Sequence, residues 1–315
     1  MRPWLLAPIA LMLLATCASD ESSVPTSPDV CSSELSPGVV NTALTAGGAT
    51  HAVRIYVPPV PAGTGVLPVV LNWHGLGESG NSQAGYTQYE ALAEKEGFIV
   101  VHPTGSRSPD LPVLNMSPGW ELIPGLDTAE RDDLAFASAL IDELVANWCA
   151  DATRIFSIGF SNGSFFTSAL VCELADRIAG AASVAGLYHP DSCTPSRPLP
   201  YIAFEGIDDP IVPFETGGPT TYPELRDTMF TLGAFDAFAA FATQFGCDEE
   251  PAISEVGEDV TRYDYLNCDD NIPMTFYAFG GVPNGHSWPG APSDSSTTHE
   301  IDATLESWHF FEGLP

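Results

Sequence analysis

Positive charge is scarce in this sequence. Only 10 of its 315 residues are lysine or arginine, against 41 aspartate and glutamate residues, and the formal net charge is −31. A chain this acidic lacks the basic surface that binds nucleic acid or an anionic membrane, so we expect neither as a partner. An acidic exterior is well hydrated, whether it reflects salty surroundings or only the composition of a lineage.

Long apolar runs are also missing. The stretch from Leu5 to Ala15 is too short to span a bilayer. It follows a short positive start, so it predicts an export signal. It leads into Leu14-Ala15-Thr16-Cys17, which resembles a bacterial lipobox with lipid attached to Cys17, although Thr16 is not the small residue usual there. Ordinary signal-peptide cleavage nearby is the alternative. We expect an extracellular, cell-surface or periplasmic protein whose only membrane contact is this anchor.

The rest of the chain predicts one large domain. Residues 1–17 form the predicted signal peptide, 18–38 a linker rich in serine and proline, and 39–315 the folded domain. The chain is 44% hydrophobic, which supplies a sizeable core.

Cysteine spacing typical of a metal site is absent as well, and we expect neither a metal nor an organic cofactor. Without Cys17, six of the seven cysteines remain, an even number that favours disulfides after export. Cys247 with Cys268 is our preferred pair, because the two flank an acidic, loop-rich stretch. Cys172 with Cys193 comes second. The acidic residues around Cys247 and Cys268 fit no EF-hand loop, so a solvated surface is favoured over calcium binding.

Strand-like and helix-like segments alternate along the chain. This order predicts an α/β fold with a mostly parallel sheet covered by helices on both faces. Strands are expected at 52–57, 67–73, 98–101, 154–158, 179–185, 201–204 and 274–279, and helices at 89–97, 132–148, 165–174 and 298–311. Residues 214–235 are too long for a turn and predict a loop or lid near the site.

The most informative motif is Gly159-Phe160-Ser161-Asn162-Gly163. It lies between a strand-like and a helix-like run, the context of the nucleophile elbow of an α/β-hydrolase. Small flanking residues let strand and helix approach closely, so that the Ser161 hydroxyl projects above the sheet. The backbone N–H of Asn162, at the start of the helix, then faces a developing oxyanion.

An acid and a base follow the serine in the order that this fold uses. Asp209 lies just after one predicted strand and His286 just after the last, at the sheet edge where such sites are built. Ser161, Asp209 and His286 therefore form a predicted triad, with Asp208 as the alternative acid.

A histidine–glycine turn supplies the second oxyanion donor. Trp73-His74-Gly75-Leu76-Gly77 follows a strand expected beside the elbow strand. We assign the donor to the backbone N–H of Leu76, and a structural role to His74.

Trp120 lies in a loop with proline and glycine, and is a candidate contact for an aryl or polymeric substrate. Burial as a loop anchor is the alternative.

Five segments together resemble the secreted family of polyhydroxybutyrate depolymerases and feruloyl or acetylxylan esterases, which are α/β-hydrolases. They are residues 69–75, 133–136, 159–163, 206–213 and 285–290, and the resemblance extends over about residues 40–312. It implies the same triad, places Trp288 near the acyl or polymer-binding cleft, and supports the bridge from Cys247 to Cys268. The chain departs from the family at Glu205, where histidine is usual, and at Ser164, where glycine is usual.

These observations predict an exported serine carboxylic ester hydrolase that works through an acyl-enzyme. Its expected substrate is a polymeric or aryl ester: a feruloyl or acetyl ester of polysaccharide, or a polyhydroxyalkanoate. The alternative is a non-catalytic, surface-anchored lipoprotein that binds carbohydrate or polymer and retains the fold. The intact triad favours the enzyme, and the oligomeric state stays open.

Overall fold

The computed structural model describes residues 35–61, 64–106, 118–120, 132–190 and 192–315. The predicted signal peptide, Cys17 and nearly all of the predicted linker lie outside them. Within the described segments, no helix combines the length and the apolar character that crossing a membrane requires.

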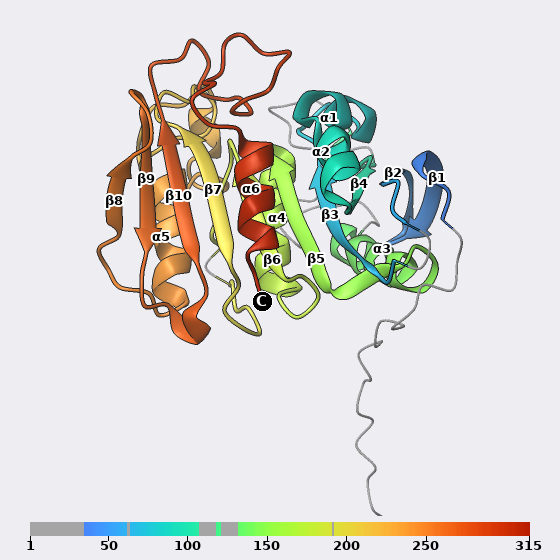
Figure 1. Ribbon diagram of the computed structural model, residues 1–315. Coiled ribbons are helices and arrows are strands. Elements are labelled where there is room, and N and C mark those ends of the chain that lie inside the picture. The colour runs from blue at the N-terminus through green and yellow to red at the C-terminus, as the bar shows by residue number, and fades with distance from the viewer. Residues whose placement is uncertain (1–34, 62–63, 107–117, 121–131, 191) are drawn as a thin grey trace, which may run out of the picture.

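Ten strands form a single sheet in the order β1-β2-β4-β3-β5-β6-β7-β10-β9-β8 (Figure 1). The inner strands from β4 to β10 run parallel, and antiparallel strands flank them at both edges. The predicted α/β architecture with a mostly parallel sheet is confirmed. The strands are β1 (Gly38–Ala46), β2 (Ala49–Val57), β3 (Leu67–Trp73), β4 (Ile99–Pro103), β5 (Ala150–Phe160), β6 (Gly180–Val184), β7 (Tyr201–Gly206), β8 (Ala252–Glu255), β9 (Val260–Tyr265) and β10 (Met274–Phe279).

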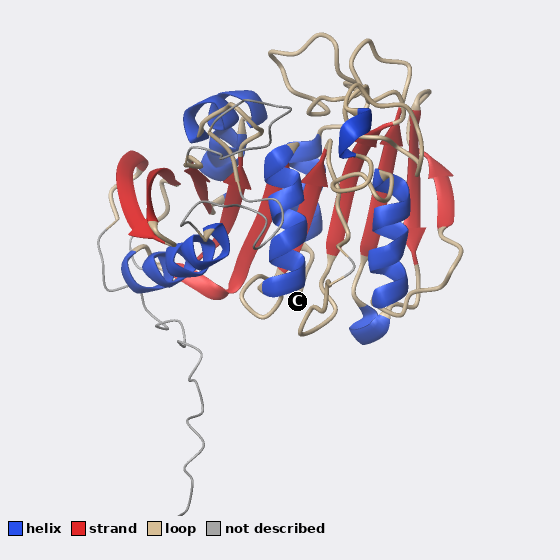
Figure 2. Ribbon diagram, turned by 180° about the vertical axis from the view of Figure 1, so that it is seen from behind, coloured by secondary structure: helices blue, strands red, loops and turns tan. Residues whose placement is uncertain are grey.

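Helices cover both faces of the sheet. They are α1 (Gly80–Thr87), α2 (Tyr89–Glu96), α3 (Asp133–Asn147), α4 (Asn162–Glu173), α5 (Ala234–Gln244) and α6 (Ala303–Glu312). In Figure 1, α6 lies in front of the sheet and α5 behind it, and Figure 2 shows the same arrangement from the back. Side chains alternate along β3, so that Val69 and Leu71 pack into one core and Val70 into the other. Such two-sided burial explains why the central strands are continuous apolar runs.

Most predicted elements are present, and their ends follow from local chemistry. α3 spans Asp133–Asn147 because the side chain of Asp132 caps it, accepting a hydrogen bond from the N–H of Ala135 at 2.8 Å. Asp133, the first residue of the helix, is fully buried, and its carboxylate lies 3.8 Å from the His51 ring.

Five elements escaped prediction. β1, β8 and β9 belong to the edge regions of the sheet and are largely exposed or half-buried, so they lack an apolar signature. α1 contains two glycines and no apolar period, and the side chain of Ser79 caps it. α5 has a clear apolar period, but follows a loop rich in glycine and proline. Its first residues fall within the predicted loop 214–235, which also holds a short 3-10 helix at Pro223–Leu225.

Candidate active site

Ser161 occupies a strained turn between β5 and α4. Its backbone angles are φ 52° and ψ −114°, in a region that residues with a side chain rarely adopt. The flanking glycines make this turn sterically feasible. A Cβ atom at Gly159 would lie 2.0 Å from the carbonyl oxygen of Gly163, and one at Gly163 would lie 2.3 Å from that of Trp73. The motif therefore reflects the close approach of β5, β3 and α4 around one serine.

The structure brings Ser161, His286 and Asp209 into one hydrogen-bonded chain. His286 Nε2 lies 2.9 Å from Ser161 Oγ, and His286 Nδ1 lies 2.7 Å from Asp209 Oδ2. An ionised carboxylate only accepts hydrogen bonds, so Nδ1–H is the donor to Asp209. Nε2 is then free to accept the serine proton. This order of donors and acceptors is the one that general-base activation of a serine requires.

Asp209, and not its neighbour Asp208, reaches the imidazole. Asp209 is 3% exposed, and its Oδ1 accepts hydrogen bonds from the N–H groups of Ile211 and Val212 at 2.7 and 2.9 Å. Asp208 is exposed to solvent. The carboxylate of Asp209 is thus held at both oxygens in the orientation that His286 needs.

The loops that carry the acid and the base cross at two glycines. A Cβ atom at Gly206 would lie 2.3 Å from the carbonyl oxygen of Gly285, and one at Gly285 would lie 2.5 Å from the backbone nitrogen of Asp209. Asn284 fixes the backbone of His286 from both sides: its amide oxygen accepts from the N–H at 3.2 Å, and its amide nitrogen donates to the carbonyl at 3.1 Å. Tight packing therefore sets the distance between the two side chains.

The histidine–glycine turn lies against the nucleophile. β3 pairs with β5 as expected, and a Cβ atom at Gly75 would lie 3.5 Å from Ser161 Cβ. Among the described residues, the N–H groups of Leu76 and Asn162 donate to no other protein group. Both therefore remain available to a bound oxyanion.

His74 supports this turn from behind. Its ring is buried, Nδ1–H donates to the Gly75 carbonyl at 2.7 Å, and Nε2 accepts from the N–H of Gly105 at 2.8 Å. Burial lowers the pKa of His74 to about 4, so the ring stays neutral and keeps this pattern. The role predicted for His74, a structural one, agrees with these contacts.

The sequence model of the phospholipase/carboxylesterase family matches residues 61–229, just over half of the chain. The chain belongs to this family. It is a carboxylic ester hydrolase with the α/β-hydrolase fold.

Relatives of this carboxylesterase include feruloyl esterases. It is 28% identical to feruloyl esterase B of Piromyces equi over 75% of this chain, which spans 42% of that larger protein. It is 26% identical to feruloyl esterase C of Emericella nidulans over 76% of this chain and 75% of the relative. An acetyl xylan esterase from Aspergillus awamori shares the fold, with a TM-score of 0.55 at 16% identity over 87% of this chain and 99% of that one.

The two candidate substrate-binding tryptophans of the carboxylesterase are structural anchors. Trp120 and Trp288 are each 1% exposed, so the indole surface proposed to contact substrate is buried in both. For Trp120 this burial favours the alternative, a loop anchor. Trp288 still lies near the site, because Phe160 packs against its ring and against that of His286. The backbone N–H of Trp120 donates to the side-chain oxygen of Asn162 at 2.7 Å. The side-chain nitrogen of Asn162 donates to the backbone carbonyl of Trp120 at 3.2 Å. Trp288 donates from its indole to Thr304 at 3.0 Å. Both tryptophans fix loops of the site, because the surrounding aromatic core closes over their rings.

The two departures from the depolymerase and esterase pattern meet behind the nucleophile. Glu205, at the end of β7, accepts from the N–H of Gly186 at 2.9 Å, and Ser164 donates to the carbonyl of the same residue. A Cβ atom at Gly186 would lie 2.9 Å from the carbonyl oxygen of Ser161. Burial raises the pKa of Glu205 well above its ordinary value. The sequence shows that Glu205 and Ser164 depart from the family pattern, but it does not show that both side chains meet at Gly186.

Two disulfides join the preferred cysteine pairs, Cys172 with Cys193 and Cys247 with Cys268. In the segments given above, no three histidine, cysteine or acidic side chains gather as metal ligands would.

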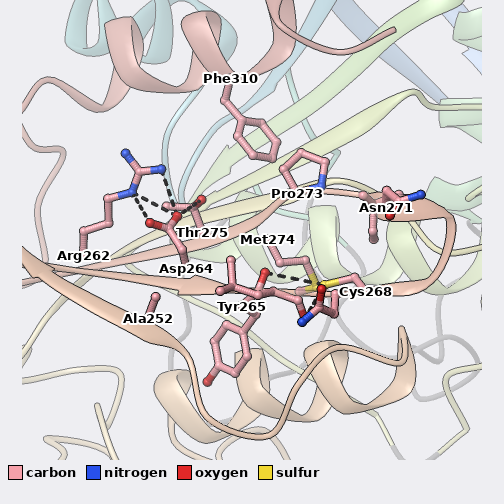
Figure 3. Close-up of a pocket in the computed structure, with 13 residues that line it drawn as sticks. Ala252, Arg262, Asp264, Tyr265, Cys268, Asn271, Pro273, Met274, Thr275 and Phe310 are labelled. Carbon is pink, nitrogen blue, oxygen red and sulfur yellow. Dashed lines mark hydrogen bonds and ion pairs between the residues drawn. The ribbon is translucent and has the colours of Figure 1, made fainter.

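A separate pocket of about 490 Å³ opens at the amino end of β10 (Figure 3). The ring of Phe310 lies over strands that carry Arg262, Asp264 and Thr275, and both Arg262 and Thr275 donate to the carboxylate of Asp264. Ser161 follows the carboxyl end of β5, at the opposite edge of the sheet. This pocket therefore lies apart from the hydrogen-bonded chain of Ser161.

Proposed function

We propose that the protein is an exported serine esterase that cleaves feruloyl or acetyl esters of polysaccharide through an acyl-enzyme. The hydrogen-bonded chain from Ser161 through His286 to Asp209 carries this proposal. The names of the feruloyl esterase relatives support the choice of ester.

The reaction follows from the donors and acceptors of the site. His286 Nε2 takes the proton of Ser161 as Oγ attacks the ester carbonyl, and Asp209 stabilises the resulting imidazolium. The N–H groups of Leu76 and Asn162 hold the oxyanion, each contributing about 3 kcal/mol. His286 then protonates the departing alcohol. In the second half, water attacks the acyl-enzyme with His286 again as the base, and the free acid leaves.

Export is supported by the disulfides, which persist in oxidising compartments. The lipid anchor at Cys17 lies outside the described residues and stays a prediction.

A fluorophosphonate probe tests the mechanism, because it labels only an activated serine. The parent protein should be labelled at Ser161, and Ser161→Ala should be folded, unlabelled and inactive. A folded parent that is never labelled would support the non-catalytic polymer-binding alternative instead.

A hydrolysis screen tests the substrate. Methyl ferulate and acetylated xylan should be cleaved faster than a polyhydroxybutyrate film. Faster cleavage of the polyhydroxybutyrate film would instead indicate a polyhydroxyalkanoate depolymerase.

A further inference from the structure

Glu78 is an acidic residue in the turn beside Ser161. The reaction described above gives its side chain no role. It closes the turn after β3, where its N–H donates to the Gly75 carbonyl at 3.2 Å. The neighbouring Gly77 N–H donates to the Pro118 carbonyl at 2.7 Å, so the turn is held from a second side. This is the turn that packs against Ser161 and contains the Leu76 N–H. The backbone of Glu78 is therefore fixed next to the reacting centre.

The carboxyl group of Glu78 lies within electrostatic reach of the base. Burial raises the pKa of Glu78, and the nearby His286 partly opposes that shift. Burial also raises the pKa of Tyr86, and the charge of Glu78 adds to the rise. The ring of Phe160 packs against both partners, with centroids 5.5 Å from Tyr86 and 5.3 Å from His286. The charges of Glu78 and His286 therefore act on each other.

No described side chain satisfies this carboxyl group. Glu78 is half-buried as a residue, and its Oε2 is buried with no hydrogen-bond partner among the described residues. Its polar neighbours are already committed, since both ring nitrogens of His286 are used within the triad. The Tyr86 hydroxyl donates to Asp294 at 3.0 Å and accepts from the N–H of Trp288 at 3.0 Å. A buried acceptor without a donor is unfavourable, and a ligand that brings a donor relieves that cost.

We propose that Glu78 is a specificity-determining residue that accepts a hydrogen bond from a hydroxyl group of the ester substrate. This inference rests on the proposed function and narrows its substrate class. Sugar esters carry hydroxyls on the alcohol side, and ferulate carries a phenolic hydroxyl on the acyl side. A polyhydroxyalkanoate repeat offers only ester oxygens and C–H groups, which leave the carboxylate unpaired. Glu78 therefore selects hydroxylated esters against that polymer.

Two matched pairs of substrates test the proposal and distinguish the source of the hydroxyl. Methyl ferulate is compared with methyl 3,4-dimethoxycinnamate, in which the phenol is methylated. Acetylated xylobiose is compared with cyclohexyl acetate, an alkyl acetate that has no donor. For at least one pair, the parent should prefer the hydroxylated member in kcat/KM, and Glu78→Leu should reduce that preference by about 10- to 100-fold. The pair that responds identifies the acyl or the alcohol side.

Two further variants keep the test decisive. Glu78→Gln retains an acceptor oxygen, so its preference should lie between those of the parent and Glu78→Leu, and it replaces the leucine variant if that one does not fold. Glu94→Leu changes an exposed glutamate on α2 and should leave the preference as in the parent.

The outcomes separate this proposal from the proposed function. A parent that hydrolyses all four esters without preference, or a Glu78→Leu variant that slows both members of each pair equally, overturns the role of Glu78 alone. A parent that hydrolyses none and resists the fluorophosphonate probe overturns the esterase mechanism, and the role of Glu78 with it.

Discussion

Replacing Asp209 by asparagine should inactivate the enzyme without unfolding it, because the surroundings dictate how the new amide is oriented. Asp209 Oδ1 accepts two backbone N–H groups and Oδ2 accepts the His286 Nδ1–H. If the amide oxygen takes the Oδ1 position, both backbone bonds survive. If the amide is flipped, its NH₂ faces the N–H groups of Ile211, which is half-buried, and of Val212, which is buried, and leaves both unpaired, at about 1–3 kcal/mol each. The first orientation therefore wins by about 2–6 kcal/mol.

That orientation places the NH₂ group against His286 Nδ1. Nδ1 must then accept, so the proton moves to Nε2, which can no longer accept from Ser161 Oγ. Loss of the correct tautomer should reduce kcat about 10⁴-fold, equivalent to about 5.5 kcal/mol in the activation barrier.

The assay is the kcat for 4-nitrophenyl acetate, with the rate of fluorophosphonate labelling as a second measure of serine activation. Thermal unfolding should change little, because the backbone bonds to Ile211 and Val212 remain. Asp208→Asn, one residue away and exposed, is the matched control and should behave like the parent. An Asp209→Asn variant with a tenth or more of the parent kcat, or an equally damaged Asp208→Asn variant, would refute the reasoning.

Three further predictions concern stability. Gly163→Ala should destabilise the fold and reduce activity, because its Cβ would meet a backbone oxygen at 2.3 Å. In the control variant Gly85→Ala, the Cβ meets nothing within 4 Å, so the free energy of unfolding measured with denaturant should increase by about 0.5–1 kcal/mol. Equal effects would contradict this. Because burial raises the folded-state pKa of Glu205, the folded protein binds more protons than the unfolded chain, and stability falls as pH rises from the unfolded-state pKa towards the folded one. Glu205→Gln removes this loss, so its free energy of unfolding relative to the parent should rise as pH increases above the unfolded-state pKa, by about 1.4 kcal/mol for each unit by which the folded-state pKa exceeds it. Denaturant unfolding at several pH values measures this, and a constant offset would argue against it. Replacing Cys247 and Cys268 by serine should cost about 3 kcal/mol for a loop that joins residues 21 apart, measured by denaturant unfolding; no loss would mean that the bridge constrains nothing.

The central sheet and the position of the triad were predictable because their signals are local. Ser161 sits in a five-residue motif, and its partners follow strands in a fixed order. Asp209 and Asp208 were not separable in this way, since both lie in the same loop. The crossing of that loop with the one holding Gly285 turns Asp209 inwards, and this contact between distant segments has no mark in the sequence.

The tryptophans show the same limit. A proline and glycine context made Trp120 look exposed, yet Trp73, Phe136 and Phe166 enclose its ring. Burial of a loop residue depends on which helices arrive from elsewhere, which local composition does not reveal. Glu78 was missed for a related reason: a single glutamate in a turn carries no pattern, and only packing leaves its Oε2 without a partner among the described residues.

The contact between Gly206 and Gly285 has a consequence for how this active site changes in evolution. Each glycine leaves room for the backbone of the other loop, so a side chain at either position displaces the acid or the base. The two loops are encoded far apart, but they must fit each other for the acid and the base to meet. Recombination that joins the Asp209 loop of one relative to the His286 loop of another succeeds only if both parents keep this crossing. New specificity is therefore easier to gain from the turn after β3, which approaches Ser161 from the other side and takes no part in the crossing.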